Sequence, residues 1–125
     1  MDGYIAFDDD SMGGLGDYMK LQQLYDEVEQ EIEELRQHDY DAADNEAQYR
    51  MMLSSQTASE RIKGTPVTVI ENLVRGEEPI AMAKVRWKKA EADARASNHL
   101  IFFKKDQIEM LKEVIKHEMF RPSNG

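Results

Sequence analysis

The most regular pattern of apolar positions lies in the second half of the chain, where an apolar residue recurs at every seventh position from Ile80. A second, mixed set follows each of these residues by three positions. The first set is Ile80, Trp87, Ala94, Ile101, Ile108 and Ile115, and the second is Ala83, Ala90, Ser97, Lys104, Leu111 and Glu118. This heptad repeat predicts a long helix over 79–121 that packs along one seam. Pro79 suits its first turn, and Pro122 lies just beyond its end.

The first half of the chain predicts a second long helix. Residues 18–63 contain neither proline nor glycine and are rich in Leu, Glu, Gln, Arg, Ala and Met, which favour helices. Apolar residues recur here at spacings of three and four, but the stripe shifts by one position near the middle. Its residues are Tyr25, Val28, Ile32 and Leu35, then Tyr40, Ala43, Ala47, Met51, Ala58 and Ile62. The shift predicts a stutter or a local kink at His38 to Asp41.

The two helices are separated by a connector at residues 61–79, R-I-K-G-T-P-V-T-V-I-E-N-L-V-R-G-E-E-P. It lacks the second glycine and the lysine of a Walker-type phosphate-binding loop. We expect a short helix over 66–75 instead, capped by Thr68 with Glu71 and stopped at Gly76. One face of this helix is apolar and needs cover from the ends of the long helices. That face consists of Val67, Ile70, Leu73 and Val74.

Together these elements predict an all-α fold, a long antiparallel helical hairpin that is coiled-coil-like and carries a short helix at its tip. The hairpin domain is expected to span 18–121 and to self-associate as a dimer. Aromatic residues make up only 8% of the chain, which suits an elongated helical protein. Residues 1–17 contain five acids, no base and four glycines. This composition disfavours both packing and helix, so we expect a flexible tail there.

Charge is distributed unevenly along the chain. The net charge is −9, but residues 1–60 hold 16 acids and three bases, a net of −13, whereas residues 61–125 carry a net of +4. The two arms can therefore neutralise each other, or an acidic face can stay open for a basic partner. Ten acids lie between positions 26 and 46, about one per ~3 Å of helix, close to the ~3.4 Å spacing of charge along a DNA strand. An acidic face that mimics DNA is one hypothesis, with candidate partner-binding residues Asp26, Glu27, Glu29, Glu33 and Glu34.

Two further surfaces are candidates for partner binding. Basic residues surround Trp87 in the stretch K-V-R-W-K-K, and they offer nucleic acid an alternative contact through Lys84, Arg86, Lys88 and Lys89. Trp87 itself falls on the heptad seam, which favours a place in the core. In the second arm, Leu100 to Phe103 form an apolar block too wide for one helix face to cover. Phe102 and Phe103 either pack against the first arm or the tail, or contact a second copy or another partner.

The sequence contains no sign of catalysis or of a cofactor. There is no cysteine, and His38, His99 and His117 are too scattered along the predicted helices to share a metal. No arrangement of a nucleophile with a base stands out, so we do not expect an enzyme. No apolar run approaches the ~18 residues that span a bilayer, and acids stand where a signal peptide carries lysines. We therefore expect a cytoplasmic protein without membrane contact.

The connector pattern Lys-Gly-x-Pro-Val-Thr-x-Ile followed by Leu-Val-Arg-Gly-Glu-Glu, set between two long helices, resembles a group of small helical proteins encoded by phages and prophages of low-GC bacteria. Their genes often lie beside replication or recombination genes. The resemblance covers about residues 20–118; the acidic tail and the stretch N-H-L-I-F-F depart from it. It implies a phage-encoded, non-enzymatic accessory protein of the bacterial cytoplasm that binds a host or phage protein and modulates or inhibits it. An accessory factor in DNA replication or recombination and a structural or assembly coiled coil are the alternatives.

Overall fold

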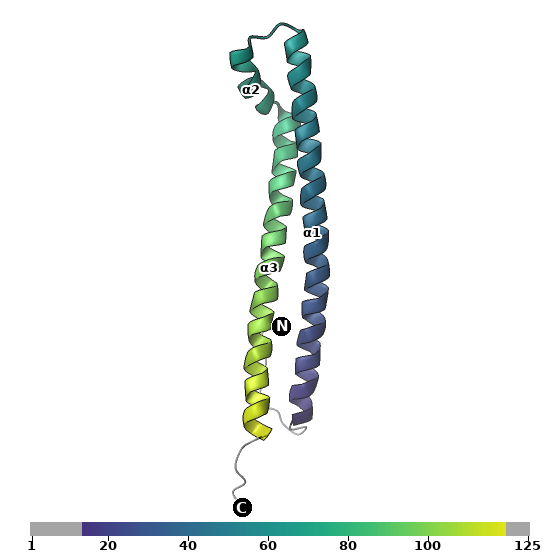
Figure 1. Ribbon diagram of the computed structural model, residues 1–125, viewed down its shortest axis with the longest axis vertical. Coiled ribbons are helices and arrows are strands. Elements are labelled where there is room, and N and C mark those ends of the chain that lie inside the picture. The colour runs from purple at the N-terminus through teal and green to yellow at the C-terminus, as the bar shows by residue number, and fades with distance from the viewer. Residues whose placement is uncertain (1–13, 120–125) are drawn as a thin grey trace, which may run out of the picture. The chain divides into compact units, whose positions relative to one another are not determined.

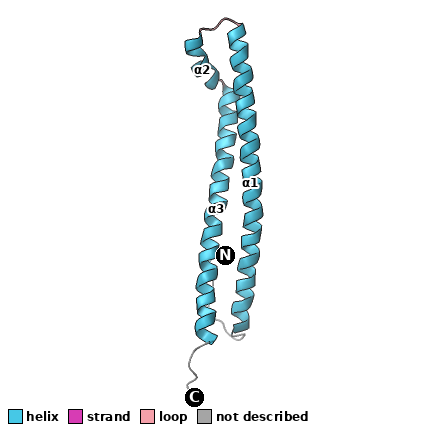
Figure 2. Ribbon diagram, viewed as in Figure 1, coloured by secondary structure: helices cyan, strands magenta, loops and turns pink. Residues whose placement is uncertain are grey.

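The computed structural model describes residues 14–119 and contains three helices within them (Figure 1, Figure 2). They are α1 (Gly14–Ile62), α2 (Val67–Arg75) and α3 (Glu78–Met119). The two long helices pack against each other, and the short helix lies between them along the chain. The predicted all-α hairpin with a short helix between its arms is therefore confirmed.

The chain divides into two compact units, and the single hairpin domain over 18–121 stays a prediction. Unit 1 combines Met1–Ile32 with Asn98–Gly125, and unit 2 is Glu33–Ser97. Each unit contains a part of α1 and a part of α3, and α2 belongs to unit 2. Helix α1 also begins at Gly14, so its first four residues fall in the predicted tail. The rest of that tail lies outside the described residues.

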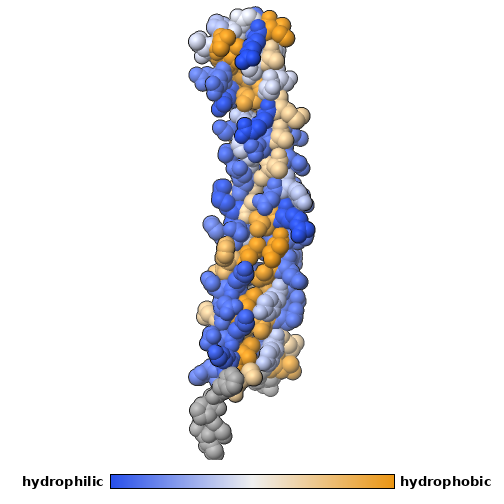
Figure 3. Space-filling model, viewed as in Figure 1, coloured by the Kyte–Doolittle hydropathy of each residue, from blue (hydrophilic) through white to orange (hydrophobic). Residues whose placement is uncertain are grey.

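In unit 1, α1 and α3 run antiparallel. The Tyr18 hydroxyl donates to Met119 Sδ at 3.5 Å, and Lys104 Nζ lies 3.2 Å from Glu27 Oε1, so the partner number falls as the α1 number rises. The buried apolar side chains of this unit are Leu24, Val28, Ile101, Ile108, Leu111 and Ile115. Burying each contributes roughly 1.5–3 kcal/mol. Figure 3, which colours each residue by its hydropathy, shows apolar residues at the surface of the lower half of the view.

In unit 2, the core gathers side chains from all three helices. It consists of Tyr49, Ile70, Val74, Ile80, Ala83 and Trp87, with Met52 and Leu53 packed against it. The rings of Tyr49 and Trp87 lie with centroids 5.6 Å apart and planes tilted by 30°, a favourable aromatic arrangement. Helix α2 is held in place because Ile70 and Val74 are fully covered. The expectation that Trp87 is a core residue is confirmed.

The predicted apolar face of α2 is only half right. Val67 is 75% exposed and Leu73 is 48% exposed, while Ile70 and Val74 are buried. At about 100° of rotation per residue, Leu73 lies ~60° to one side of Ile70, whereas Val74 and Val67 lie ~40° and ~60° to the other side. A helix of nine residues packs along a narrow stripe, so the two outer side chains remain in solvent.

The seam of α1 follows one unbroken repeat, and the predicted stutter at His38 to Asp41 is wrong. Helix α1 continues through these residues without a break. Its buried and half-buried side chains alternate at spacings of four and three. The seam positions are Asp17, Leu21, Leu24, Val28, Glu31, Leu35, His38, Ala42, Asn45, Tyr49, Met52, Gln56 and Ser59, and further covered residues such as Glu27, Leu53 and Glu60 flank them. The predicted stripe failed because about half of these positions are polar, whereas large apolar residues stand outside the seam: Tyr25, Ile32, Tyr40, Met51 and Ile62 are all exposed.

The turn between α1 and α2 depends on a glycine and on one carboxylate. Gly64 has a φ of +86°, in the left-handed region that favours glycine, and its N–H donates to the Arg61 carbonyl at 3.1 Å. The Thr65 hydroxyl donates to Glu60 Oε1 at 2.7 Å, and Lys63 lies 3.3 Å from the same carboxylate. These contacts, the Thr65 hydrogen bond foremost, hold the pKa of Glu60 below its usual value.

The bounds of α2 agree with the predicted 66–75 at both ends to within one residue, but the predicted cap does not. Gly76 ends the helix as predicted, with its N–H donating to the Asn72 carbonyl at 3.2 Å. At the other end, Pro66 stands in the cap position and no side chain caps the helix. The predicted capping box of Thr68 with Glu71 is wrong, because Thr68 already lies in the first turn of α2 and the preceding Thr65 is used by Glu60.

Replacing Gly64 by alanine should lower the free energy of unfolding by about 1–2 kcal/mol, the cost of a side chain in the left-handed region. Gly76→Ala is the matched control, because Gly76 has an ordinary φ of −85° and a new Cβ would lie 3.4 Å from its nearest neighbour. That variant should be neutral or slightly stabilising. Urea unfolding followed by circular dichroism measures both, and equal losses for the two variants would contradict the assignment.

Candidate functional site

Unit 2 contains a groove of about 470 Å³ that is lined by all three helices. Tyr49 contributes from α1, Arg75 from the last turn of α2, and the remaining lining residues come from about three turns of α3. The α3 residues are Ala81, Lys84, Val85, Lys88, Lys89 and Ala92. The groove exists because packing of Ile70 and Val74 fixes α2 beside the start of α3. It is a concave surface of the size that binding sites usually have.

The groove has an apolar floor and a cationic rim. Its lining includes Arg75, Lys84, Lys88 and Lys89, and no acidic residue. Arg75 lies 3.1 Å from Glu71 and Lys88 lies 3.3 Å from Glu91, so these two charges are partly neutralised by neighbours on their own helices. Within the described part of the chain, Lys84 and Lys89 are exposed and have no hydrogen-bond or ion-pair partner. Positive charge therefore remains available at the groove.

The structure brings together three of the four predicted basic residues. Lys84, Lys88 and Lys89 line the groove, whereas Arg86 is exposed and does not line it. Sequence reasoning missed Arg75 and Tyr49, which reach the groove from α2 and α1. No spacing in the sequence places these two residues beside the lysines, because their approach depends on how the three helices pack.

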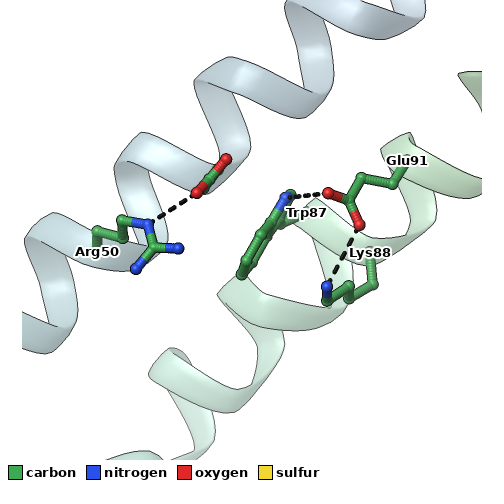
Figure 4. Close-up of polar contacts among 5 residues, drawn as sticks. Arg50, Trp87, Lys88 and Glu91 are labelled. Atoms are coloured by element: carbon green, nitrogen blue, oxygen red, sulfur yellow. Dashed lines mark hydrogen bonds and ion pairs between the residues drawn. The ribbon is translucent and has the colours of Figure 1, made fainter.

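Trp87 lies under this basic surface and is itself covered (Figure 4). It is 9% exposed, and its indole N–H donates to Glu91 Oε2 at 3.0 Å. Lys88 Nζ lies 4.2 Å from the ring centroid, and the Arg50 guanidinium lies 5.4 Å from it, on the side of α1. These cation–π contacts fix both side chains around the indole. The ring is therefore part of the core and does not present a free face for stacking on a base.

The predicted acidic residues divide between the two units. Asp26, Glu27 and Glu29 belong to unit 1, and Glu33 and Glu34 belong to unit 2. All except Glu27 are exposed. Asp26 accepts a hydrogen bond from Gln22 at 3.0 Å, and Glu33 lies 3.6 Å from Arg36, both on the same helix. Such exposed contacts between near neighbours contribute little and leave the carboxylates accessible.

Glu27 differs from the other four because the hairpin itself uses it. Its carboxylate accepts from Gln23 at 3.0 Å and pairs with Lys104 of α3 at 3.2 Å. The Gln23 hydrogen bond, and after it Lys104, lower the pKa of Glu27. Lys104 stands at a seam position between Ile101 and Ile108, where its side chain is partly buried. The Glu27 carboxylate compensates the positive charge of this partly buried lysine. Glu27 is thus a contact between the helices and is less suited to bind a partner.

Phe102 and Phe103 are both exposed within unit 1, at 59% and 56%. The first of the two predicted arrangements, in which they pack against α1, is not observed. The tail residues that the same prediction named lie outside the described residues. Two more exposed apolar side chains, Leu100 and Met110, lie near them on α3. This part of α3 therefore presents apolar side chains that remain exposed.

The described residues contain neither a candidate metal cluster nor a candidate membrane-crossing helix. No cluster of three or more His, Asp or Glu side chains among residues 14–119 could hold a metal ion. In the same range, no helix is both long and apolar enough to cross a bilayer.

Comparison with known proteins does not assign the chain to a family. The chain matches no protein-family model, no curated protein and no solved structure. The function must therefore be inferred from the exposed charges, the groove and the apolar surface.

Replacing Glu27 by glutamine should lower the free energy of unfolding by ~0.5 kcal/mol at pH 7, the usual worth of a partly exposed ion pair. Glu29→Gln is the control, since Glu29 is exposed and should change nothing. The pKa of Glu27 is lowered in the folded state, so its contribution is complete above the unfolded pKa and is lost as the pH falls through the folded value. The difference from wild type should therefore shrink below about pH 4 in urea titrations. An equal effect of both variants would contradict the structural role of Glu27.

Proposed function

We propose that the chain is a non-enzymatic accessory protein that binds a protein partner with a basic surface and modulates or inhibits it. The observation that carries this proposal is the set of exposed carboxylates on α1 that α3 does not neutralise. They are Asp26, Glu29, Glu33 and Glu34. Most ion pairs of the described residues join neighbours on one helix. The lysines of α3 in these pairs contact acids of α3 and do not neutralise the four carboxylates of α1.

A partner that normally binds nucleic acid fits this surface. Six of the ten acids between positions 26 and 46 are exposed, which places one accessible carboxylate per ~5 Å of helix, a density approaching that of charge on a DNA strand. A nuclease, a recombinase or a defence factor of the bacterial host would meet them with the lysines and arginines of its own binding cleft. The resemblance of the connector to phage proteins supports such a role in the host cytoplasm.

Direct contact with nucleic acid is the alternative that this proposal competes with. Lys84, Lys88 and Lys89 would supply the phosphate contacts. Trp87, however, offers no free ring for stacking, and the net charge of −9 repels a polyanion at a distance. A structural or assembly coiled coil is a further alternative, and it would depend on Phe102 and Phe103 instead.

The test is recovery of partner proteins on immobilised full-length chain from phage-infected and uninfected host lysates, quantified by mass spectrometry. Asp26→Asn with Glu29→Gln, and Glu33→Gln with Glu34→Gln, neutralise the acids of each unit separately. We expect at least one pair to reduce recovery of the partner by about ten-fold, equivalent to ~1.4 kcal/mol. Partner binding should also weaken with added salt.

Two matched variants serve as controls for this test. Lys84→Gln with Lys89→Gln removes two positive charges, as a counterpart to the acidic variants. Phe102→Ser with Phe103→Ser removes the exposed apolar side chains of α3. Both should leave recovery of the partner unchanged. If the acidic variants keep the partner while the lysine variant loses it, the accessory protein works through its basic residues, and the proposal is wrong.

A further inference from the structure

The groove of unit 2 has a chemistry that neither the acidic surface nor the core explains. Four cations surround a floor made of Tyr49, Ala81, Val85 and Ala92. A simple anion would use the charges but not the floor, and an apolar ligand would use the floor but not the charges. The ligand that uses both is a peptide in which acidic residues adjoin a bulky apolar or aromatic one.

A segment with this chemistry stands at the start of the same chain. Residues 1–13 read M-D-G-Y-I-A-F-D-D-D-S-M-G and lie outside the described residues. Tyr4, Ile5 and Phe7 provide the bulky side chains, and three consecutive aspartates follow Phe7 directly. The four acids of this segment equal in number the four cations that line the groove. No other stretch of the sequence places two aromatic residues and a run of three acids within ten positions.

We propose that residues 1–13 of one copy dock in the groove of a second copy. The segment precedes α1 in the chain, and the groove belongs to unit 2. Docking between two copies does not depend on how the two units of one copy are placed. Phe7 or Tyr4 packs on the apolar floor, and the aspartates meet Lys84 and Lys89, whose charges have no partner within the described residues. The docking links copies of the chain and leaves the acids of α1 free.

The phosphates of a nucleic acid would bind the same cations, but its bases would make little contact with the apolar floor of the groove. Base stacking requires an aromatic face, and the Trp87 ring is covered by Lys88 and by the packing of Tyr49. A peptide side chain needs only apolar contact, which the floor provides. The observations therefore favour the acidic segment, and nucleic acid is an outcome that the experiment must be able to reveal.

The experiment places the photo-crosslinking residue p-benzoylphenylalanine at position 7 of the full chain, by the substitution Phe7→p-benzoylphenylalanine. Equal amounts of ¹⁵N-labelled and unlabelled copies are mixed, irradiated and digested. We expect crosslinked dimers, with mixed-isotope crosslinks that join residue 7 to peptides from 75–92. Lys84→Gln with Lys89→Gln should reduce the dimer yield by roughly ten-fold, the factor that two exposed charge contacts supply together.

Arg86→Gln is the matched control, because Arg86 is an exposed cation of the same helix that does not line the groove. Its dimer yield should equal that of the starting protein. Circular dichroism spectra confirm that all variants keep their helices. Crosslinks that map outside the groove, that form only within one copy, or that survive loss of both lysines would overturn the proposal. So would a single-stranded oligonucleotide that binds through Lys84 and Lys89 and abolishes the dimer crosslink.

Discussion

The packing of one face of α3 against α1 is the interaction on which the rest of the structure depends. In α3 this face is apolar at nearly every seventh residue, and Ile80, Ile101, Ile108 and Ile115 are all buried. In α1 the opposing face alternates apolar and polar side chains, with Glu31 and Asn45 among the polar ones. Each helix alone would lack enough apolar contact to be stable in water, so the two form together. Helix α2 joins this packing through Ile70 and Val74 and so creates the groove of unit 2.

The sequence correctly predicted the three helices, but it predicted most of the buried face of α1 wrongly. Both outcomes have one physical reason. Periodicity reveals a buried face only where that face is apolar, as it is in α3. In α1, polar residues such as His38 and Gln56 occupy seam positions, while Tyr40 and Met51 are exposed, so the apolar stripe pointed to the wrong register. The basic cluster on α3 was visible in the sequence because its residues are neighbours. The groove was not, because its other walls come from distant positions.

Opposite charge on the two halves of the chain serves two purposes in this account. A few contacts, such as Glu27 with Lys104, hold the helices together, but much of the charge faces outward. We propose that the acids of α1 bind a basic partner and that the cations around the groove bind an acidic segment of another copy. Exposed charges of this kind contribute little to stability, so recognition is the role that we propose for them.

The most direct test of the account is hydrogen exchange along α1, because a continuous seam requires a continuous helix. The amides of residues 36–45, measured by NMR, should exchange as slowly as those of the neighbouring turns in unit 2, since each is held in the ladder of one uninterrupted helix. Exchange at the rate of an unprotected chain in this stretch, with protection on both sides of it, would show that α1 is broken there. That result would contradict the single register of the seam.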